Sequence, residues 1–263
     1  MTSCFTGYEV YGLIGPQGKH NRGLGSLQFH RCYCAGRRVS YPCPNFLSFA
    51  EIMSHTDFWI IRHGETDWNT QRRLQGWRDI PLNPTGVAQA RALSAHLQTH
   101  FAQAEPAHIY SSDLERAYQT ALPYAQSRNK FVQQLRGLRE RNYGVLEGRL
   151  WSELTGLDSA RNHNMAIELN PDEHKAEDLA TFYARIRQTL NGLAQQHRNE
   201  TVMIVSHGGA IDMMWRAAGK LPPDAPREFT QRNTSINRLR IANDDDWQIV
   251  SWADTAHLPG LPA

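Results

Sequence analysis

The chain has 263 residues, of which 40% are hydrophobic and 21% charged, with 28 lysines and arginines against 26 aspartates and glutamates. This length and composition suffice for a globular domain with a full hydrophobic core. The nearly balanced charge, without a block of like-charged residues, argues against nucleic acid or an anionic membrane as a partner. No apolar run approaches the roughly 18 residues of a transmembrane helix, so the sequence predicts a soluble protein.

Composition divides the chain near Met53. All four cysteines and seven of the 19 glycines fall in residues 1–52, which show no helical or strand periodicity beyond Tyr8–Ile14. We expect residues 1–52 to be a disordered extension or a segment upstream of the natural start, and residues 53–263 to be the functional domain. Two other interpretations of this segment are disfavoured. Cys32, Cys34 and Cys43 could supply three thiolates to zinc, but the paired Cys-x2-Cys spacing of zinc sites is missing. A secretory signal would need a basic start followed by an uninterrupted apolar stretch, and the segment has neither.

From Met53 onward, apolar runs alternate with segments of helical period, as in α/β proteins with a largely parallel sheet. The sequence predicts strands at residues 58–61, 108–111, 131–135, 201–205, 235–241 and 247–252. A long polar loop through Leu82 follows the first strand, and helices are predicted at residues 84–101, 114–125 with a kink at Pro123, 179–195 and 210–218. The predicted fold is a three-layer α/β sandwich, with a mostly parallel central sheet flanked by helices.

The first predicted helix has both a start signal and an apolar face. Asn83 is a good N-cap and Pro84 is favoured at the first helical position. The helical period places five apolar residues on one face, namely Val87, Ala90, Leu93, Leu97 and Phe101. The start signal and the apolar face therefore agree on a helix here.

Two of the predicted strands end in the same pattern. Four apolar residues, one polar residue, a histidine and a glycine occur at Phe58–Gly64 and again at Val202–Gly208. The carboxyl ends of parallel strands form the ligand crevice of such sheets, so His63 and His207 are expected in one cleft. Each following glycine would let the backbone approach a ligand closely. A lone histidine is more simply explained as a surface or core residue, but a matched pair favours a site.

At Arg62-His63-Gly64-Glu65-Thr66 the sequence resembles the signature of the histidine phosphatase superfamily, the phosphoglycerate mutase-like enzymes. The resemblance covers nearly all of residues 57–257 and implies the phosphoglycerate mutase-like fold. Six further segments match in the family's order: Asp67–Asn69, Arg73–Trp77, Asp79–Gly86, Tyr110–Ala117, Leu138–Gly144 and Val205–Gly209.

The resemblance implies a role for each catalytic position. His63 would be the nucleophile that carries a phosphohistidine, with His207 stabilising the transferring phosphoryl group. Arg62 and Arg116 would bind the phosphate dianion, for which the guanidinium fork is well suited. Glu140 matches the general acid, whereas Glu147 matches a structural position. Further phosphate- or substrate-binding positions by the same resemblance are Gly64, Thr66, Asn69, Gln75, Gly76, Tyr143 and Gly208.

The sequence implies neither a metal nor another cofactor for this chemistry. The two histidines are 144 positions apart, and no His-Glu-x-x-His or paired-carboxylate spacing accompanies them. The arginines already supply the positive charge that a phosphate needs. The sequence also lacks the Gly-x-Ser-x-Gly elbow of Ser-His-Asp hydrolases and the Gly-x-x-x-x-Gly-Lys loop that binds phosphate in other proteins.

Three departures from the cofactor-dependent mutases favour a metal-independent phosphatase acting on a small phosphomonoester. The chain between Glu140 and His207 is shorter than theirs, and Trp151 stands where they carry a substrate-binding lysine. Their Arg-Arg pair is missing from Arg161–Ile167. The smaller, mutase-like phosphatases match better at Arg72–Gly76 and at the ending Asp254–Leu258. A phosphoglycerate mutase and an inactive scaffold or binding module remain the alternatives.

The sequence leaves the substrate and the oligomeric state open. Sugar phosphates, phosphoglycerates, nucleotides and the α-ribazole phosphate of cobalamin synthesis all fit the resemblance, because loops such as Thr155–Lys175 would decide among them. The lack of cysteine after residue 52 suits a reducing cytoplasm. The resemblance itself suggests a bacterial source.

Overall fold

The computed structural model describes residues 32–34, 37–39, 54–100, 105–155, 169–243 and 246–258. The chain divides into two units, Met1–Ser48 and Phe49–Ala263. In the first unit, β1 (Cys32–Cys34) pairs antiparallel with β2 (Arg37–Val39). The sequence did not predict these strands, because three residues are too few to form a periodic pattern. The other residues of the predicted extension, Cys4 and Cys43 among them, lie outside the described residues.

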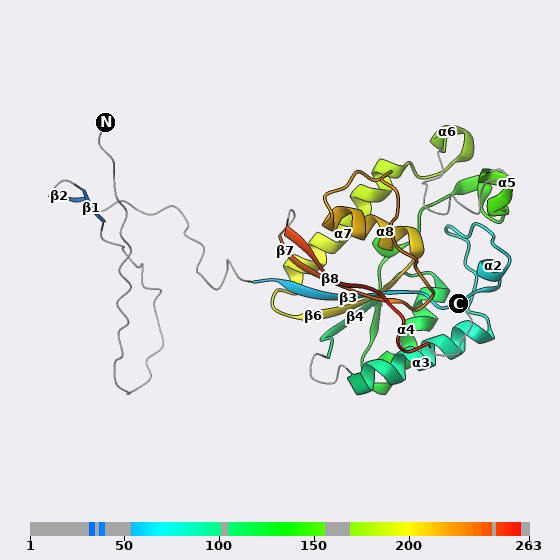
Figure 1. Cartoon of the computed structure of the whole chain (residues 1–263), viewed down its shortest axis with the longest axis horizontal. Coiled ribbons are helices and arrows are strands. Elements are labelled where there is room, and N and C mark those ends of the chain that lie inside the picture. Colours follow the sequence, from blue (N-terminus) through cyan, green and yellow to red (C-terminus); the bar gives the residue numbers. More distant parts are fainter. Residues whose placement is uncertain are drawn as a thin grey trace. The chain divides into compact units, whose positions relative to one another are not determined.

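A six-stranded sheet forms the centre of the second unit, in the order β5-β4-β6-β3-β7-β8 (Figure 1). The strands are β3 (Thr56–Arg62), β4 (His108–Ser111), β5 (Val132–Gln134), β6 (Thr201–Ser206), β7 (Ile236–Asn243) and β8 (Asp246–Asp254). The first four strands in chain order, β3 to β6, pair in parallel, whereas β7 and β8 are antiparallel. The predicted sheet is confirmed, with each strand within two residues of its predicted ends.

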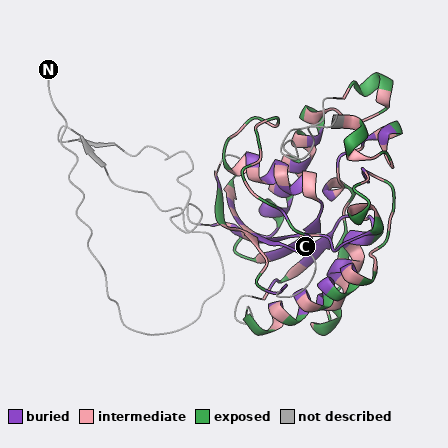
Figure 2. Ribbon diagram, turned by 45° about the vertical axis from the view of Figure 1, so that its right-hand side comes forward, coloured by how far each residue is buried: buried purple, intermediate pink, exposed green. Residues whose placement is uncertain are grey.

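Helices cover both faces of this sheet. The helices α7 (Leu179–Gln196) and α8 (Gly208–Ala218) lie on one face, and α3 (Pro84–His100) and α4 (Glu115–Ser127) lie on the other (Figure 1). Because side chains alternate along a strand, Phe58 and Ile60 join the core under α7 and α8, whereas Trp59 and Ile61 join the core under α3 and α4. Figure 2 shows the sheet buried between these layers. The predicted three-layer sandwich is confirmed.

Several short elements occupy regions for which the sequence predicted no helix. They are α2 (Asp67–Thr70), the 3-10 helices η2 (Arg136–Leu138) and η3 (Gly144–Leu146), α5 (Trp151–Thr155) and α6 (Pro171–His174). Each has five residues or fewer, so none could show a helical period. Two of them, α2 and α5, supply Asn69 and Trp151 to the lining of the site described below.

The apolar face predicted for α3 is buried only in part. Ala90, Leu93 and Leu97 are buried, but Val87 is 37% exposed, and Phe101 lies outside the described residues. The first turn instead buries Gly86, where an added Cβ would lie 2.1 Å from the carbonyl oxygen of Glu65. Close backbone packing therefore decides which side of the first turn faces inward, and the apolar period does not report it.

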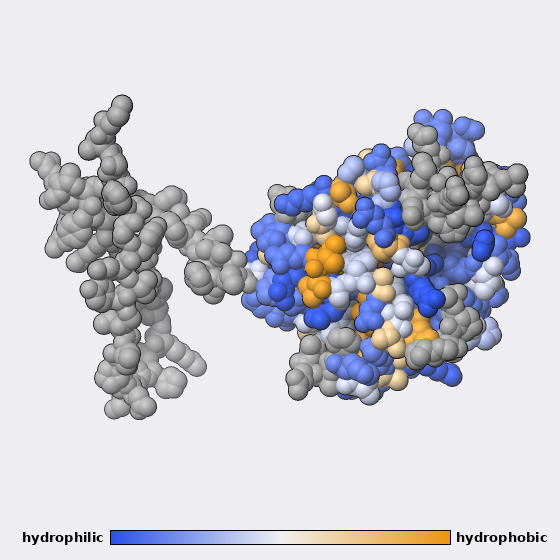
Figure 3. Space-filling model, viewed as in Figure 1, coloured by the Kyte–Doolittle hydropathy of each residue, from blue (hydrophilic) through white to orange (hydrophobic). Residues whose placement is uncertain are grey.

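The surface in Figure 3 is largely hydrophilic, with an apolar patch where Figure 1 places β7 and β8. Ile249 and Val250 on the edge strand β8 are exposed, 42% and 45% respectively. In the described part of the chain, none of the helices combines the length and apolar composition that crossing a bilayer requires.

Candidate active site

Two histidines meet at the carboxyl end of the sheet. β3 and β6 are neighbours with Arg62 opposite Ser206, and the amide of His63 donates a hydrogen bond of 2.9 Å to the carbonyl of Ser206. His207 is the N-cap of α8. The ring centroids of His63 and His207 lie 5.2 Å apart, and both side chains are buried. The structure thus brings together the two strand ends that share the repeated sequence pattern.

The protonation of His63 follows from its contacts. Its Nδ1 lies 2.7 Å from the carbonyl oxygen of Gly64, which can only accept, so Nδ1 carries the proton and Nε2 keeps the lone pair. Burial, together with the nearby Arg116 and Arg62, lowers the pKa of this imidazole well below 6.5. The side chain of Asn233 donates a 2.9 Å hydrogen bond to the carbonyl of His63. His63 is therefore neutral, oriented and able to attack through Nε2.

His207 has no such anchor. Neither ring nitrogen has a hydrogen-bond partner among the residues that the structure describes, although the side chain is fully buried. Burial, with Arg116 as the largest neighbouring charge, lowers its pKa well below 6.5. An orphaned buried polar group is costly and calls for a partner. The neutral ring of His207 lies beside His63 without a partner among the described residues, so it can donate a hydrogen bond to a ligand oxygen.

Two arginines border the histidines and are held by backbone carbonyls. Arg116, fully buried at the start of α4, donates from Nη1 to Arg78 and from Nη2 to Gly76, at 2.8 Å each. Arg62 donates from Nη1 to the carbonyl of Gln231. The Nε of each arginine has no partner among the described residues. Burial lowers both pKa values to about 10, so both side chains stay cationic at neutral pH with N–H groups available for an anion.

Glu140 is held by two backbone amides. Its Oε2 accepts a hydrogen bond of 2.8 Å from Gly209, and its Oε1 accepts one of 2.8 Å from Arg141. Burial raises the pKa of this carboxyl above 4.5, and the two amides oppose the shift in part. Each oxygen keeps a second lone pair, so the protonated acid remains compatible with both bonds. By contrast, Glu147 accepts from the amide of Trp77 at 2.8 Å, in keeping with a structural role.

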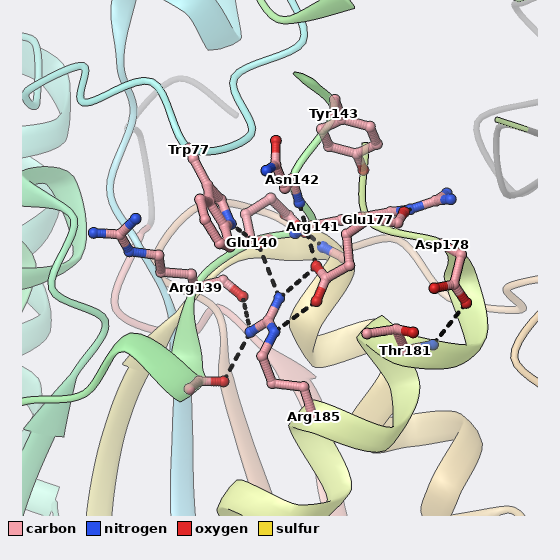
Figure 4. Close-up of polar contacts among 12 residues, drawn as sticks. Trp77, Arg139, Glu140, Arg141, Asn142, Tyr143, Glu177, Asp178, Thr181 and Arg185 are labelled. Carbon is pink, nitrogen blue, oxygen red and sulfur yellow. Dashed lines mark hydrogen bonds and ion pairs between the residues drawn. The ribbon is translucent and has the colours of Figure 1, made fainter. Parts of the chain in front are cut away.

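The loop that ends in Glu140 is braced by α7 (Figure 4). Arg185 on this helix forms a two-pronged ion pair with Glu177, with both N–O distances at 2.8 Å. The same guanidinium donates to three loop carbonyls, those of Gly137 at 2.9 Å, Arg139 at 3.1 Å and Glu140 at 3.2 Å. Trp77 Nε1 donates to the Glu140 carbonyl at 2.8 Å from the other side. No motif in the sequence marks Arg185 or Glu177 as a site residue.

Nine of the twelve site residues expected from the sequence line a cavity of about 540 Å³: Arg62, His63, Asn69, Gln75, Gly76, Arg116, Glu140, Tyr143 and Gly208. The other three, His207, Gly64 and Thr66, do not line it. The Gly64 amide donates to the Thr120 hydroxyl at 2.9 Å, and Thr66 caps α2 through a reciprocal capping box with Asn69. The last two therefore support the site from behind.

The cavity also contains polar residues that the sequence analysis did not assign to the site: Arg73, Arg141, Asp212, Arg216, Arg227 and Gln231. Asp212 could have been found, because it lies one helical turn after Gly208 at the strand end. Arg227 and Gln231 come from residues 219–235, which show no periodic pattern. Gln231 is buried, and neither its Oε1 nor its Nε2 has a partner within the described part of the chain.

The lining is strongly cationic, with six arginines against two carboxylates. Asp212 pairs with Arg227 at 3.3 Å and with Arg216 at 3.8 Å, and burial raises its pKa against the effect of these two arginines. The excess positive charge suits a phosphate dianion. Trp151, the residue expected in place of a lysine, also lines the cavity, whereas Arg161–Ile167 lies outside the described residues.

Comparison with known families decides the membership of the chain. The family model of the histidine phosphatase superfamily (branch 1) matches residues 58–255. The chain belongs to this superfamily. As a member of the histidine phosphatase superfamily, it shares its fold with phosphoglycerate mutase-like proteins, and its homologues are enzymes that act as phosphatases or mutases.

Among similar histidine phosphatase relatives are two proteins of Arabidopsis thaliana. Phosphoglycerate mutase-like protein 4 is 31% identical to this chain, in an alignment that covers 80% of this chain and 90% of the relative. A metal-independent phosphoserine phosphatase is 32% identical, covering 78% and 84%. The crystal structure of a phosphoserine phosphatase from Entamoeba histolytica, in complex with 3-phosphoglyceric acid, is 29% identical and superposes with a TM-score of 0.64, covering 77% of this chain and 99% of that one.

Proposed function

We propose that this protein is a phosphatase that hydrolyses a small phosphomonoester through a phosphohistidine on His63, with no metal in the reaction. The observation that carries the proposal is the environment of His63 Nε2. This nitrogen keeps its lone pair beside the unpartnered His207 and two arginines whose Nε groups lack partners among the described residues. A neutral nucleophile next to fixed cations is the arrangement that attack on a phosphate dianion requires.

In the first step, Nε2 of His63 attacks phosphorus, the P–N bond forms and the P–O bond to the leaving group breaks. Arg62, Arg116 and His207 donate hydrogen bonds to the phosphoryl oxygens as charge spreads over them. The protonated Glu140 gives its proton to the departing oxygen, so the leaving group departs as an alcohol. The raised pKa of Glu140 supports this role, because an acid must hold its proton at the working pH.

In the second step, the Glu140 carboxylate takes a proton from a water molecule as the oxygen of that water attacks phosphorus. The P–N bond breaks, inorganic phosphate leaves, and His63 returns to its neutral form with the proton still on Nδ1. The hydrogen bond from Nδ1 to Gly64 supports this return, since it holds one tautomer throughout the cycle. Glu140 ends the cycle protonated, as it began.

Water as the acceptor of the phosphoryl group is supported by the residues that line the cavity. Trp151 contributes no charge where the mutases are expected to bind substrate with a lysine. The name of the Arabidopsis phosphoserine phosphatase supports hydrolysis, whereas that of the mutase-like relative supports transfer. The cationic lining also suits substrates with a second anionic group, such as phosphoserine or 3-phosphoglycerate. We therefore keep a phosphoglycerate mutase as the alternative.

The test uses the full chain with phosphoserine, 3-phosphoglycerate and p-nitrophenyl phosphate in excess chelator, wild type against His63→Ala. Release of inorganic phosphate that resists the chelator and vanishes in the variant supports the proposal. Interconversion of phosphoglycerates without phosphate release would instead establish the mutase. Folded protein with neither activity would favour a scaffold or binding module.

A further inference from the structure

Two histidines and a glutamate meet at the opposite edge of the sheet from the active site. His108 is the first residue of β4, Glu200 immediately precedes β6, and His197 is the C-cap of α7. β4 and β6 are parallel neighbours with His108 opposite Val202, so their amino ends adjoin. The catalytic histidines follow the carboxyl ends, and a six-residue strand spans about 20 Å. The cluster is therefore separate from the cavity described above.

The three side chains present their ligand atoms to one another. Glu200 Oε2 lies 3.1 Å from His108 Nε2 and 3.0 Å from His197 Nδ1, and all three atoms lie within 4.8 Å of one another. Tetrahedral zinc with bonds near 2.0–2.1 Å places its ligand atoms about 3.3–3.4 Å apart. The two distances from Glu200 Oε2 to the histidine nitrogens are thus already within a few tenths of an ångström of that spacing. Among the described residues, this is the one group of three metal-ligand side chains that meets so closely.

A second residue is placed to orient His197. The hydroxyl of Tyr110 lies 2.8 Å from His197 Nε2, and both side chains are buried. Metal-binding histidines commonly hydrogen-bond through their other ring nitrogen, which fixes the tautomer and the ring plane. With a metal on Nδ1, the Nε2–H of His197 would donate to the Tyr110 oxygen. His108 and Glu200 are partly exposed, which leaves an entry path and a fourth position for water.

We propose that His108, His197 and Glu200 form a binding site for a divalent transition metal, with zinc as the best match. Two imidazoles and one carboxylate are ligands that suit zinc. The site would fasten the end of α7 to the amino ends of β4 and β6, so its effect is on stability and not on the reaction. Without metal, the Glu200 carboxylate can accept hydrogen bonds from both rings, so the cluster is satisfied in either state.

The competing sites in this chain determine the design of the test. The cysteines of residues 1–52 could bind metal through thiolates, and cobalt(II) distinguishes the two cases because thiolate ligation adds intense charge-transfer absorption. The full chain is therefore titrated with cobalt(II) and then zinc(II). The variants are His108→Ala, Glu200→Gln and Tyr110→Phe, with His174→Ala as a matched control on α6. Glu200 is exposed, so Glu200→Gln removes a ligand without disturbing the core.

The proposal predicts one cobalt per chain without thiolate charge transfer, displaced by zinc, with zinc raising the Tm of the wild type. His108→Ala and Glu200→Gln should each abolish the binding and the rise in Tm, and His174→Ala should keep both. Tyr110→Phe should weaken binding about 10- to 100-fold. Binding unchanged in Glu200→Gln, binding seen only with thiolate absorption, or no cobalt retained after dialysis would each overturn the proposal.

Discussion

Glu140 Oε2 accepts a hydrogen bond of 2.8 Å from the amide of Gly209, in the first turn of α8. This bond ties the proposed acid to the same strand end that carries His207. The two groups therefore depend on one another for position, and substitutions on either side should be felt in the reaction.

Gly209→Ala should lower kcat by about 100-fold, because the new Cβ would lie 2.3 Å from Glu140 Oε1 and displace the carboxyl group. The matched control is Gly192→Ala on α7, where an added Cβ meets nothing within 4 Å. We expect the control to keep full activity and to gain up to about 1 kcal/mol in stability. Steady-state kinetics and urea unfolding measure both, and equal activities of the two variants would contradict the placement of Glu140.

The pH dependence should have limbs set by two groups. His63 must be neutral to attack, and its pKa lies well below 6.5, so the rate falls only when the pH drops through that low value. Glu140 must be protonated, and its pKa lies above 4.5, so the rate falls as the pH rises through the raised value. We therefore expect an acidic optimum in a pH–rate profile of kcat/KM. A rate that climbs steadily towards alkaline pH would be incompatible with Glu140 as the acid.

Glu140→Gln should slow substrates in proportion to how poorly their leaving group departs. Phosphoserine releases a basic alkoxide and should lose about 100- to 10,000-fold in kcat, whereas p-nitrophenyl phosphate needs little protonation in the first step. Initial rates and the burst of p-nitrophenol released before hydrolysis of the phosphoenzyme measure the difference. Equal losses in the first step for both substrates would show that Glu140 acts in another way. Glu153→Gln, an exposed residue of α5, is the control.

Arg185 should act as a positioning residue for the loop that holds Glu140. Arg185→Lys keeps the charge but loses the fork that binds Glu177 and the loop carbonyls, so we expect a 10- to 100-fold fall in kcat with little change in KM. The alkaline limb of the pH profile should shift as well, because Glu140 would change its surroundings. Arg187→Lys, on the same helix over the ring of Tyr183, should leave the profile unchanged. A purely structural role would lower stability without moving that limb.

Stability should also depend on pH through the buried histidines. The pKa of His207 is lowered in the folded state, so below about pH 6.5 only the unfolded chain binds its proton and the free energy of unfolding falls. The loss is about 1.4 kcal/mol per pH unit from this group while the folded-state ring stays neutral. His207→Gln should remove this component. Urea unfolding at pH 7.5 and pH 5.5 tests it, and an identical pH dependence of the variant and the wild type would contradict the burial of a neutral His207.

Local patterns predicted the scaffold well, because strands and long helices leave a period in the sequence. The repeat of apolar residues, histidine and glycine placed His63 and His207 together, and the helices α3, α4, α7 and α8 followed from their apolar spacing. Val87 in α3 is the exception, since it fits the apolar period but is exposed. The close packing of Gly86 against the backbone of Glu65 makes the first turn bury Gly86 in its place.

The rest of the site could not be read locally, because it depends on contacts between distant segments. Gln231 reaches the cavity from a segment without periodicity, and its backbone carbonyl binds Arg62, 169 positions away. Arg185 lies on a helix that was predicted at residues 179–195, but nothing in the helical pattern distinguishes it from a surface arginine. Apart from the Glu177 carboxylate, the partners of Arg185 are backbone carbonyls, which the sequence does not encode as residue types.

The proposed reaction requires that His63 carry the phosphoryl group. The most direct measurement is mass spectrometry of the wild-type chain, quenched under denaturing, non-acidic conditions during turnover of phosphoserine or p-nitrophenyl phosphate in excess chelator, followed by peptide mapping. We expect one added phosphoryl group, located on the peptide that contains His63 and missing from His63→Ala. Turnover by a folded wild type with no adduct, or an adduct on any other residue, would contradict it.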